Sequence, residues 1–171
     1  MRIVCLFLLL ASVSVAGAQG TGSAISFPEA QAALLMHNAA RQEVGVPPLH
    51  WSDKLAAVAQ SWAVHLACNG CRMRHRPDTG AQAVPYGENL FWGPGAQFDA
   101  ASASRAWYGE INKFTYGVLT AANWYGAGHY TQMIWRHTTQ VGMGAARCPD
   151  GSWIIVANYD PAGNYLGQAP Y

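Results

Sequence analysis

The amino-acid sequence predicts a single α+β domain in which helices precede strands. Three segments before residue 115 carry helical patterns of apolar residues. Two shorter apolar segments, 140–148 and 153–158, enclose the turn sequence Pro149-Asp150-Gly151, which predicts an antiparallel hairpin. No internal repeat, low-complexity tract or linker divides the chain. Helices followed by strands favour the α+β class.

The three predicted helices have recognisable ends. Ser26 and Glu29 have capping-box spacing, and Pro28 suits a first helical turn, so the first helix is expected from there to Gly45. The second is expected from Ser52 to Asn69-Gly70. Its apolar face consists of Leu55, Val58, Ala59, Trp62, Ala63 and Leu66.

The third helix is predicted over 100–114, where apolar residues again share one face. Residues 71–98 are rich in proline, glycine and polar side chains and show no period, so we expect loops there. Residues 161–171 contain repeated glycine and proline breaks and are expected to be coil.

The N-terminus has the pattern of a signal peptide over 1–18. A basic start precedes the apolar run Ile3–Leu10, and small residues lead to a cleavage site after Ala18. An uncleaved anchor is the alternative. We expect a flexible tail over 19–26, a domain over 27–171 and no transmembrane segment, because no later stretch approaches ~20 apolar residues. The protein is then extracellular, or periplasmic if bacterial, and Cys5 leaves with the leader.

The charge balance argues against nucleic acid as a partner. Lys+Arg is 10 against Asp+Glu 9, and removing Arg2 leaves 9 against 9. A chain of zero formal charge has no global field that attracts polyanions. Charged residues make up 11% against roughly 25% in a typical soluble domain, so a sizeable core is expected.

Local motifs of common enzymes are missing from the sequence. It contains no Gly-x-Ser-x-Gly elbow, His-Glu-x-x-His, phosphate-binding glycine loop or dinucleotide fingerprint. Cys68-Asn69-Gly70-Cys71 has the spacing of a redox pair or half a zinc site. The second cysteine pair that a structural zinc site needs is missing, and in an exported protein we favour a structural disulfide. Three cysteines remain after the leader, so one thiol is left over.

The six histidines fall into two groups. Four have ordinary explanations on helices or in turns: His37, His50, His65 and His137. His75 and His129 lie in segments crowded with polar groups and glycine, with Glu88 and Glu110 between them. Their spacings do not by themselves identify a metal site.

Two segments carry a resemblance to a known family. Gly128–Arg136 and Ile155–Tyr165 resemble the two signatures of the CAP superfamily, which groups cysteine-rich secretory proteins, antigen 5 and plant pathogenesis-related class one proteins. The resemblance extends from about Phe27 to Tyr171. Further matches in the family's order are His37-Asn38, Leu49-x-Trp51, Cys71 with His75, and Tyr86–Leu90.

The resemblance implies a three-layer α-β-α sandwich with a central antiparallel sheet and a cavity lined by His75, Glu88, Glu110 and His129. Two imidazoles and two carboxylates suit a divalent metal such as zinc. Neutral imidazoles are needed, so metal should be lost as the pH falls through ~6.5. The alternative is a polar cluster that merely ties loops to a helix. Tyr130 is expected to present its hydroxyl to the cavity wall.

The resemblance further implies a secreted, non-enzymatic protein that binds a divalent metal and a lipid, such as a sterol, or an extracellular protein. One alternative is a metal-dependent hydrolase in which Glu88 or Glu110 is the general base. Another is a precursor of a signalling peptide, because residues 161–171 look like the peptide that some plant members release. Asn158-Tyr159-Asp160 would precede that cleavage site.

The resemblance also implies the disulfide Cys71–Cys148. Other family cysteines correspond here to Met143 and Ala157. Cys68 then becomes the odd thiol of a monomer, or the link of a disulfide-bonded dimer. The alternative is a Cys68–Cys71 bridge with Cys148 free.

Overall fold

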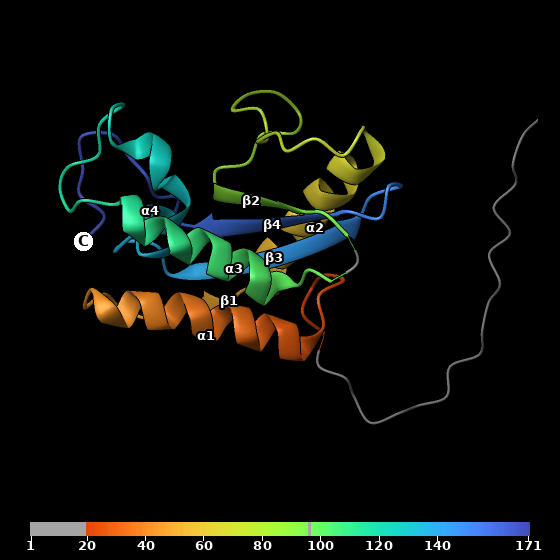
Figure 1. Cartoon of the computed structure of the whole chain (residues 1–171), viewed down its shortest axis with the longest axis horizontal. Coiled ribbons are helices and arrows are strands. Elements are labelled where there is room, and N and C mark those ends of the chain that lie inside the picture. The colour runs from red at the N-terminus through yellow and green to blue at the C-terminus, as the bar shows by residue number, and fades with distance from the viewer. Residues whose placement is uncertain (1–19, 96) are drawn as a thin grey trace, which may run out of the picture.

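The computed structural model describes residues 20–95 and 97–171, which form a sheet covered by helices on both faces (Figure 1). The signal peptide expected over 1–18, and Cys5 within it, lie outside the described residues. The helices are α1 (Phe27–Glu43), α2 (Asp53–Cys68), α3 (Ala100–Tyr108) and α4 (Gly128–Met133), with the 3-10 helices η1 (Gly109–Lys113) and η2 (Trp124–Gly126). The strands are β1 (His50–Trp51), β2 (Gly87–Gly93), β3 (Gln140–Arg147) and β4 (Trp153–Asp160).

The four strands are ordered β1-β3-β4-β2. The hairpin partners β3 and β4 are antiparallel, as are β2 and β4, whereas β1 runs parallel to β3. The α+β class is therefore confirmed, but the sheet is mixed rather than wholly antiparallel. The parallel pair arises because a long connection separates β1 from β3, and such connections allow parallel pairing.

The central strand β4 divides the core into two layers. Successive side chains of a strand point to opposite faces. Ile155, Ala157 and Tyr159 pack with residues of α1, α3 and α4, whereas Ile154 and Val156 pack against α2. This alternation produces the helix–sheet–helix sandwich that the resemblance implies.

Glycines in β3 let α2 lie directly on the sheet. A Cβ atom added to Gly142 or Gly144 would collide with the α2 backbone at Ala56 or Gln60. The Gln60 amide also donates to the Ala145 carbonyl at 2.8 Å and accepts from the Ala145 amide at 3.1 Å. The side chain thus satisfies the backbone of β3 beyond the end of the short β1.

The predicted helix starts are confirmed, and one predicted end is not. The Glu29 carboxylate accepts from the Ser26 amide at 2.8 Å, and the Ser52 hydroxyl accepts from the Leu55 amide. The third helix was expected to reach residue 114, but α3 ends at Tyr108 and the chain tightens into η1. This change of winding places Glu110 on a 3-10 turn.

Arg41 connects α1 to the C-terminal end of α4. Its side chain is fully buried, and its guanidinium donates only to carbonyls: those of Pro47, Met133, Trp135 and Thr138. Burial lowers the pKa of Arg41 to about 10, and Tyr159 opposes that change. The charge is therefore retained at neutral pH and satisfies the carbonyl of Met133, the last residue of α4, together with carbonyls of the loops that contain Pro47, Trp135 and Thr138.

Several segments are more ordered than the sequence predicts. Residues 20–26 pack on the domain rather than forming the expected flexible tail: Thr21 and Ile25 are buried, and the Trp51 indole donates to the Thr21 carbonyl. The supposed loop region 71–98 contains β2. In the part of the chain that the structure describes, no helix is both long and apolar enough to cross a membrane.

A disulfide joins Cys71, just after α2, to Cys148 at the end of β3, with 5.9 Å between the two Cα atoms. The alternative Cys68–Cys71 bridge is not formed. Cys68 carries an exposed free thiol. The two cysteines are 77 positions apart in the sequence, so the bond closes a long loop. It also anchors the segment that leads to His75.

Candidate functional site

All four predicted metal-site residues line one cavity of about 440 Å³. It is formed where β2, η1, η2 and the start of α4 meet the loop after α2. Its lining residues are His75, Glu88, Asn89, Glu110, Trp124, Tyr125, Gly128, His129 and Asn164. Residues as far apart in the sequence as His75 and Asn164 thus contribute to the same polar cavity.

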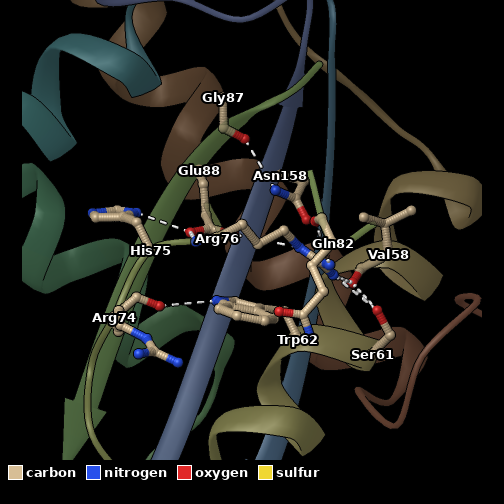
Figure 2. Close-up of polar contacts among 10 residues, drawn as sticks. All are labelled: Val58, Ser61, Trp62, Arg74, His75, Arg76, Gln82, Gly87, Glu88 and Asn158. Carbon is tan, nitrogen blue, oxygen red and sulfur yellow. Dashed lines mark hydrogen bonds and ion pairs between the residues drawn. The ribbon is translucent and has the colours of Figure 1, made fainter. Parts of the chain in front are cut away.

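The first half of the site is the pair His75–Glu88. His75 Nδ1 lies 2.9 Å from Glu88 Oε1, and the same oxygen accepts from the Arg76 amide at 3.1 Å (Figure 2). The His75 side chain is 61% exposed, whereas that of Glu88 is only 8% exposed. A buried carboxylate therefore holds an imidazole that faces solvent.

The second half repeats this arrangement with different elements. His129 Nδ1 lies 2.7 Å from Glu110 Oε1. Glu110 Oε2 accepts from the amides of His129 and Tyr130 at 2.9 and 3.2 Å. The Trp107 ring stacks on His129, with ring centroids 6.2 Å apart. Every Glu110 oxygen is thus engaged by the start of α4.

Burial raises the pKa of Glu110, but hydrogen bonds from the His129 ring and the two amides outweigh it. The net effect holds the pKa of this carboxyl below its usual value. Glu110 is ionised at neutral pH and can only accept hydrogen bonds.

The two carboxylates determine which ring nitrogen of each histidine is available. An ionised carboxylate accepts, so the neutral His75 and His129 rings carry their proton on Nδ1. The lone pair of each Nε2 then remains free, and no described residue forms a hydrogen bond with either atom. Histidine ligands of metals are held in this way by carboxylates that bind their other nitrogen.

Comparison of the sequence with known protein families identifies the family. Residues 34–159 match the family described as CAP, the cysteine-rich secretory protein family. The chain belongs to the CAP family. The resemblance seen in the two signature segments is thereby confirmed.

Plant proteins are among the similar relatives of this CAP chain. It is 42% identical over 135 residues to pathogenesis-related protein 1C of Nicotiana tabacum, which covers 79% of this chain and 76% of that protein. It is 41% identical over 138 residues to pathogenesis-related protein 1 of Arabidopsis thaliana, covering 81% and 80%. Among solved structures, NaASP2 with Zn2+ superposes with a TM-score of 0.76 at 26% identity, covering 91% of this chain and 90% of that one.

The four predicted ligands of this CAP cavity are arranged as two imidazole–carboxylate pairs. In residues 20–95 and 97–171, the only group of three or more candidate donor atoms within mutual reach is Cys71, Cys148 and Asp150. Two of these three form the disulfide and offer no thiolate. In the cavity, Glu88 and Glu110 each contact the Nδ1 atom of a histidine, an arrangement in which a carboxylate orients an imidazole.

Tyr130 does not line the cavity, contrary to the expectation from the sequence. Its side chain is only 1% exposed, and its ring packs against Tyr108 and Phe114. Burial raises the pKa of Tyr130 to about 12. Neighbouring residues of a helix point in different directions, so His129 faces the cavity while Tyr130 faces the core.

Five of the nine cavity residues were not predicted from the sequence as site residues: Asn89, Trp124, Tyr125, Gly128 and Asn164. Trp124 and Tyr125 lie on or beside η2, and Tyr125 is 89% exposed. Asn164 connects the C-terminal segment to α4: its side chain donates to the Gly128 carbonyl and accepts from the Thr131 hydroxyl, both at 2.7 Å. The second signature contains Asn164, but nothing in its local pattern indicates that it reaches the cavity.

Proposed function

We propose that this protein is a secreted CAP-family binding protein that holds a divalent metal ion, with zinc the expected metal, at His75 and His129. One observation carries the proposal: each ring has Nδ1 engaged by its own carboxylate and Nε2 free in the same cavity. The description of NaASP2 with Zn2+ supports a metal in a protein of this fold. When bound, the ion supplies a Lewis-acidic centre.

The carboxylate contacts favour binding over hydrolysis. A hydrolase needs a general base beside an activated water. Glu110 uses both oxygens for the His129 ring and the α4 amides, and Glu88 uses one for His75 and the Arg76 amide. Glu110 therefore has no oxygen left to take a proton from water, and the second oxygen of Glu88 is buried beside Arg76.

A secreted location and an extracellular partner complete the proposal. The disulfide is of the kind that persists in oxidising compartments, and the relatives are pathogenesis-related proteins. Trp124 is 41% exposed and Tyr125 89% exposed beside the cavity, and exposed aromatic groups of this kind mark sites that bind lipids or proteins. We propose a sterol-containing membrane or an extracellular protein as the partner.

The C-terminal peptide hypothesis meets a structural obstacle. Residues 161–171 are held by backbone hydrogen bonds from Arg136 to Pro170 at 2.7 Å, from Leu119 to Gln168 at 2.9 Å and from Gly167 to Leu119 at 2.8 Å. A single cut before Pro161 would leave the peptide bound. Mass spectrometry of the filtrate after cleavage, with and without denaturant, tests whether it is released.

Metal binding is tested by titrating zinc into the metal-free protein and following the heat. We expect one ion per chain, and at least a tenfold loss of affinity in His75→Ala and in His129→Ala. His137→Ala is the matched control, because that histidine is exposed and outside the cavity. Equal binding by wild type and both cavity variants would reject the site.

The partner is tested separately by sedimenting the zinc-loaded protein with phosphatidylcholine vesicles that contain or lack sterol. We expect sterol-dependent binding that weakens in Tyr125→Ser, because the aromatic surface is lost. Val64→Ser, which alters an exposed apolar residue on α2, is the control. Absence of binding to both vesicles would reject the lipid partner.

A further inference from the structure

Arg76, the residue after His75, is clamped onto α2. Its Nη2 donates to the Val58 carbonyl at 2.6 Å and to the Ser61 hydroxyl at 2.8 Å. Its guanidinium carbon lies 4.9 Å from the centre of the Trp62 ring, within the range of a cation–π contact. Figure 2 shows these contacts converging on one end of the guanidinium. Three partners from one helix therefore determine where this charge lies.

The other edge of the guanidinium faces Glu88. Arg76 Nε lies 3.7 Å from Glu88 Oε2, and the two side chains are 12% and 8% exposed. Nε, Oε2 and the Asn158 Oδ1 atom are buried, and none has a hydrogen-bond partner among the described residues. Glu88 and Asn158 are register partners on β2 and β4, and both side chains point toward Arg76 in Figure 2. Arg76 is thus the nearest countercharge of the buried carboxylate.

This countercharge bears on the orientation of Glu88. A buried carboxylate is costly unless a cation or hydrogen bonds compensate it. Glu88 Oε1 is satisfied by His75 and the Arg76 amide, whereas Oε2 has only the guanidinium nearby. Without the charge, the carboxylate gains by turning to solvent. That change removes the acceptor for His75 Nδ1.

We propose that Arg76 is a positioning residue of the metal site. It holds Glu88 oriented so that the His75 proton stays on Nδ1 and Nε2 remains available to the metal. This inference rests on the proposed function for its metal, but the tautomer of His75 is a property of the metal-free protein. The guanidinium itself touches neither the ion nor any ligand.

The His129 half provides an internal control. Glu110 is compensated by the His129 ring and by two amides of α4, with no arginine involved. A change at Arg76 should therefore alter His75 alone. A general loosening of the fold would alter both rings.

The experiment uses the full mature chain and four proteins: wild type, Arg76→Met, Arg76→Lys and Arg74→Met. Methionine keeps much of the length and the contact with Trp62 but removes the charge. Lysine keeps the charge without the planar fork. Arg74→Met is the matched control. The exposed Arg74 side chain has no hydrogen bond or ion pair with any residue that the structure describes, and its removal changes the net charge by the same amount.

Two readouts are taken. Nitrogen-15 NMR of the imidazoles, without metal and at about pH 8, reports the tautomer of each histidine. We expect His75 to carry its proton on Nδ1 in wild type and Arg74→Met, to lose that preference in Arg76→Met and to regain it in Arg76→Lys. His129 should stay unchanged throughout. Zinc affinity should fall about tenfold in Arg76→Met, as for other residues that orient metal ligands.

An unchanged His75 tautomer in Arg76→Met, or equal changes at His75 and His129, overturns the inference. Failure of wild type to bind zinc rejects the proposed function, and the tautomer data still decide the role of Arg76. If Arg76→Met does not fold, Arg76→Gln takes its place with the same expectation. The countercharge argument would also be overturned if His75 lost its preference for the Nδ1 proton in Arg76→Lys as fully as in Arg76→Met.

Discussion

Acidification should destabilise the fold through the buried His37. The ring has no solvent exposure, and its Nδ1 donates to the Ala33 carbonyl at 2.8 Å. Its Nε2 accepts from the Tyr159 hydroxyl at 2.8 Å, and that hydroxyl in turn accepts from the Asn89 amide at 3.0 Å. The neutral ring is therefore fully satisfied. Protonating Nε2 would place a charge away from water, near the cation of Arg41.

The size of the effect follows from the pKa of His37. Burial, opposed by the Ala33 hydrogen bond and assisted by Arg41, lowers that pKa from 6.5 to about 4. Between these values the unfolded chain binds a proton that the native protein lacks, so stability is lost as the pH falls below 6.5. Linkage gives a loss of about 2 kcal/mol at about pH 5 and about 3 kcal/mol at about pH 4.

The assay compares urea unfolding of wild type and His37→Gln, followed by tryptophan fluorescence, at about pH 7, 5 and 4. Other groups that titrate contribute to both proteins, so the difference in their pH dependence isolates His37. Wild type should lose about 2 kcal/mol more than the variant by about pH 5. Parallel pH profiles for the two proteins would refute the reasoning, because they would mean that His37 has the same pKa folded and unfolded.

Three further changes test the fold. Replacing both Cys71 and Cys148 by serine should lower the free energy of unfolding by roughly 4 kcal/mol, because the disulfide closes a long loop. Chemical denaturation measures this free energy. If reducing the disulfide of the wild-type protein left its stability unchanged, the prediction would be contradicted. Gly144→Ala should cost about 1–3 kcal/mol, because its Cβ meets the backbone of Gln60; a melting temperature equal to that of wild type would mean that α2 shifts freely. Arg41→Met should cost about 3 kcal/mol or more by leaving buried carbonyls without donors, and calorimetry showing wild-type stability would exclude that role.

The parts of the fold that depend on local patterns could be predicted from the sequence. Ser26 and Ser52 cap helices through contacts with residues three positions later in the chain, so the starts of α1 and α2 could be predicted from the local sequence. Strand β2 was not, because Gly87, Glu88 and Asn89 show no alternation of apolar and polar residues. Its identity as a strand depends on pairing with β4, some seventy residues later in the chain.

The candidate site was predictable as a set of residues but not as an arrangement. The resemblance named both histidines and both glutamates, and all four line one cavity. Which glutamate meets which histidine, and through which nitrogen, depends on the 3-10 turn of η1 and on the packing of β2. Those contacts follow from tertiary structure. The contacts of Arg76 could not be predicted either, because nothing in the neighbouring sequence indicates that its side chain packs on α2.

The two halves of the cavity depend on segments that are synthesised last. Asn158, on β4, lies beside Glu88, and Asn164 holds the start of α4, where His129 lies. A nascent chain that has reached only His129 already contains every imidazole and carboxylate of the site, and Arg76, but neither Asn158 nor Asn164. The cavity that we propose as the metal site therefore requires the completed chain.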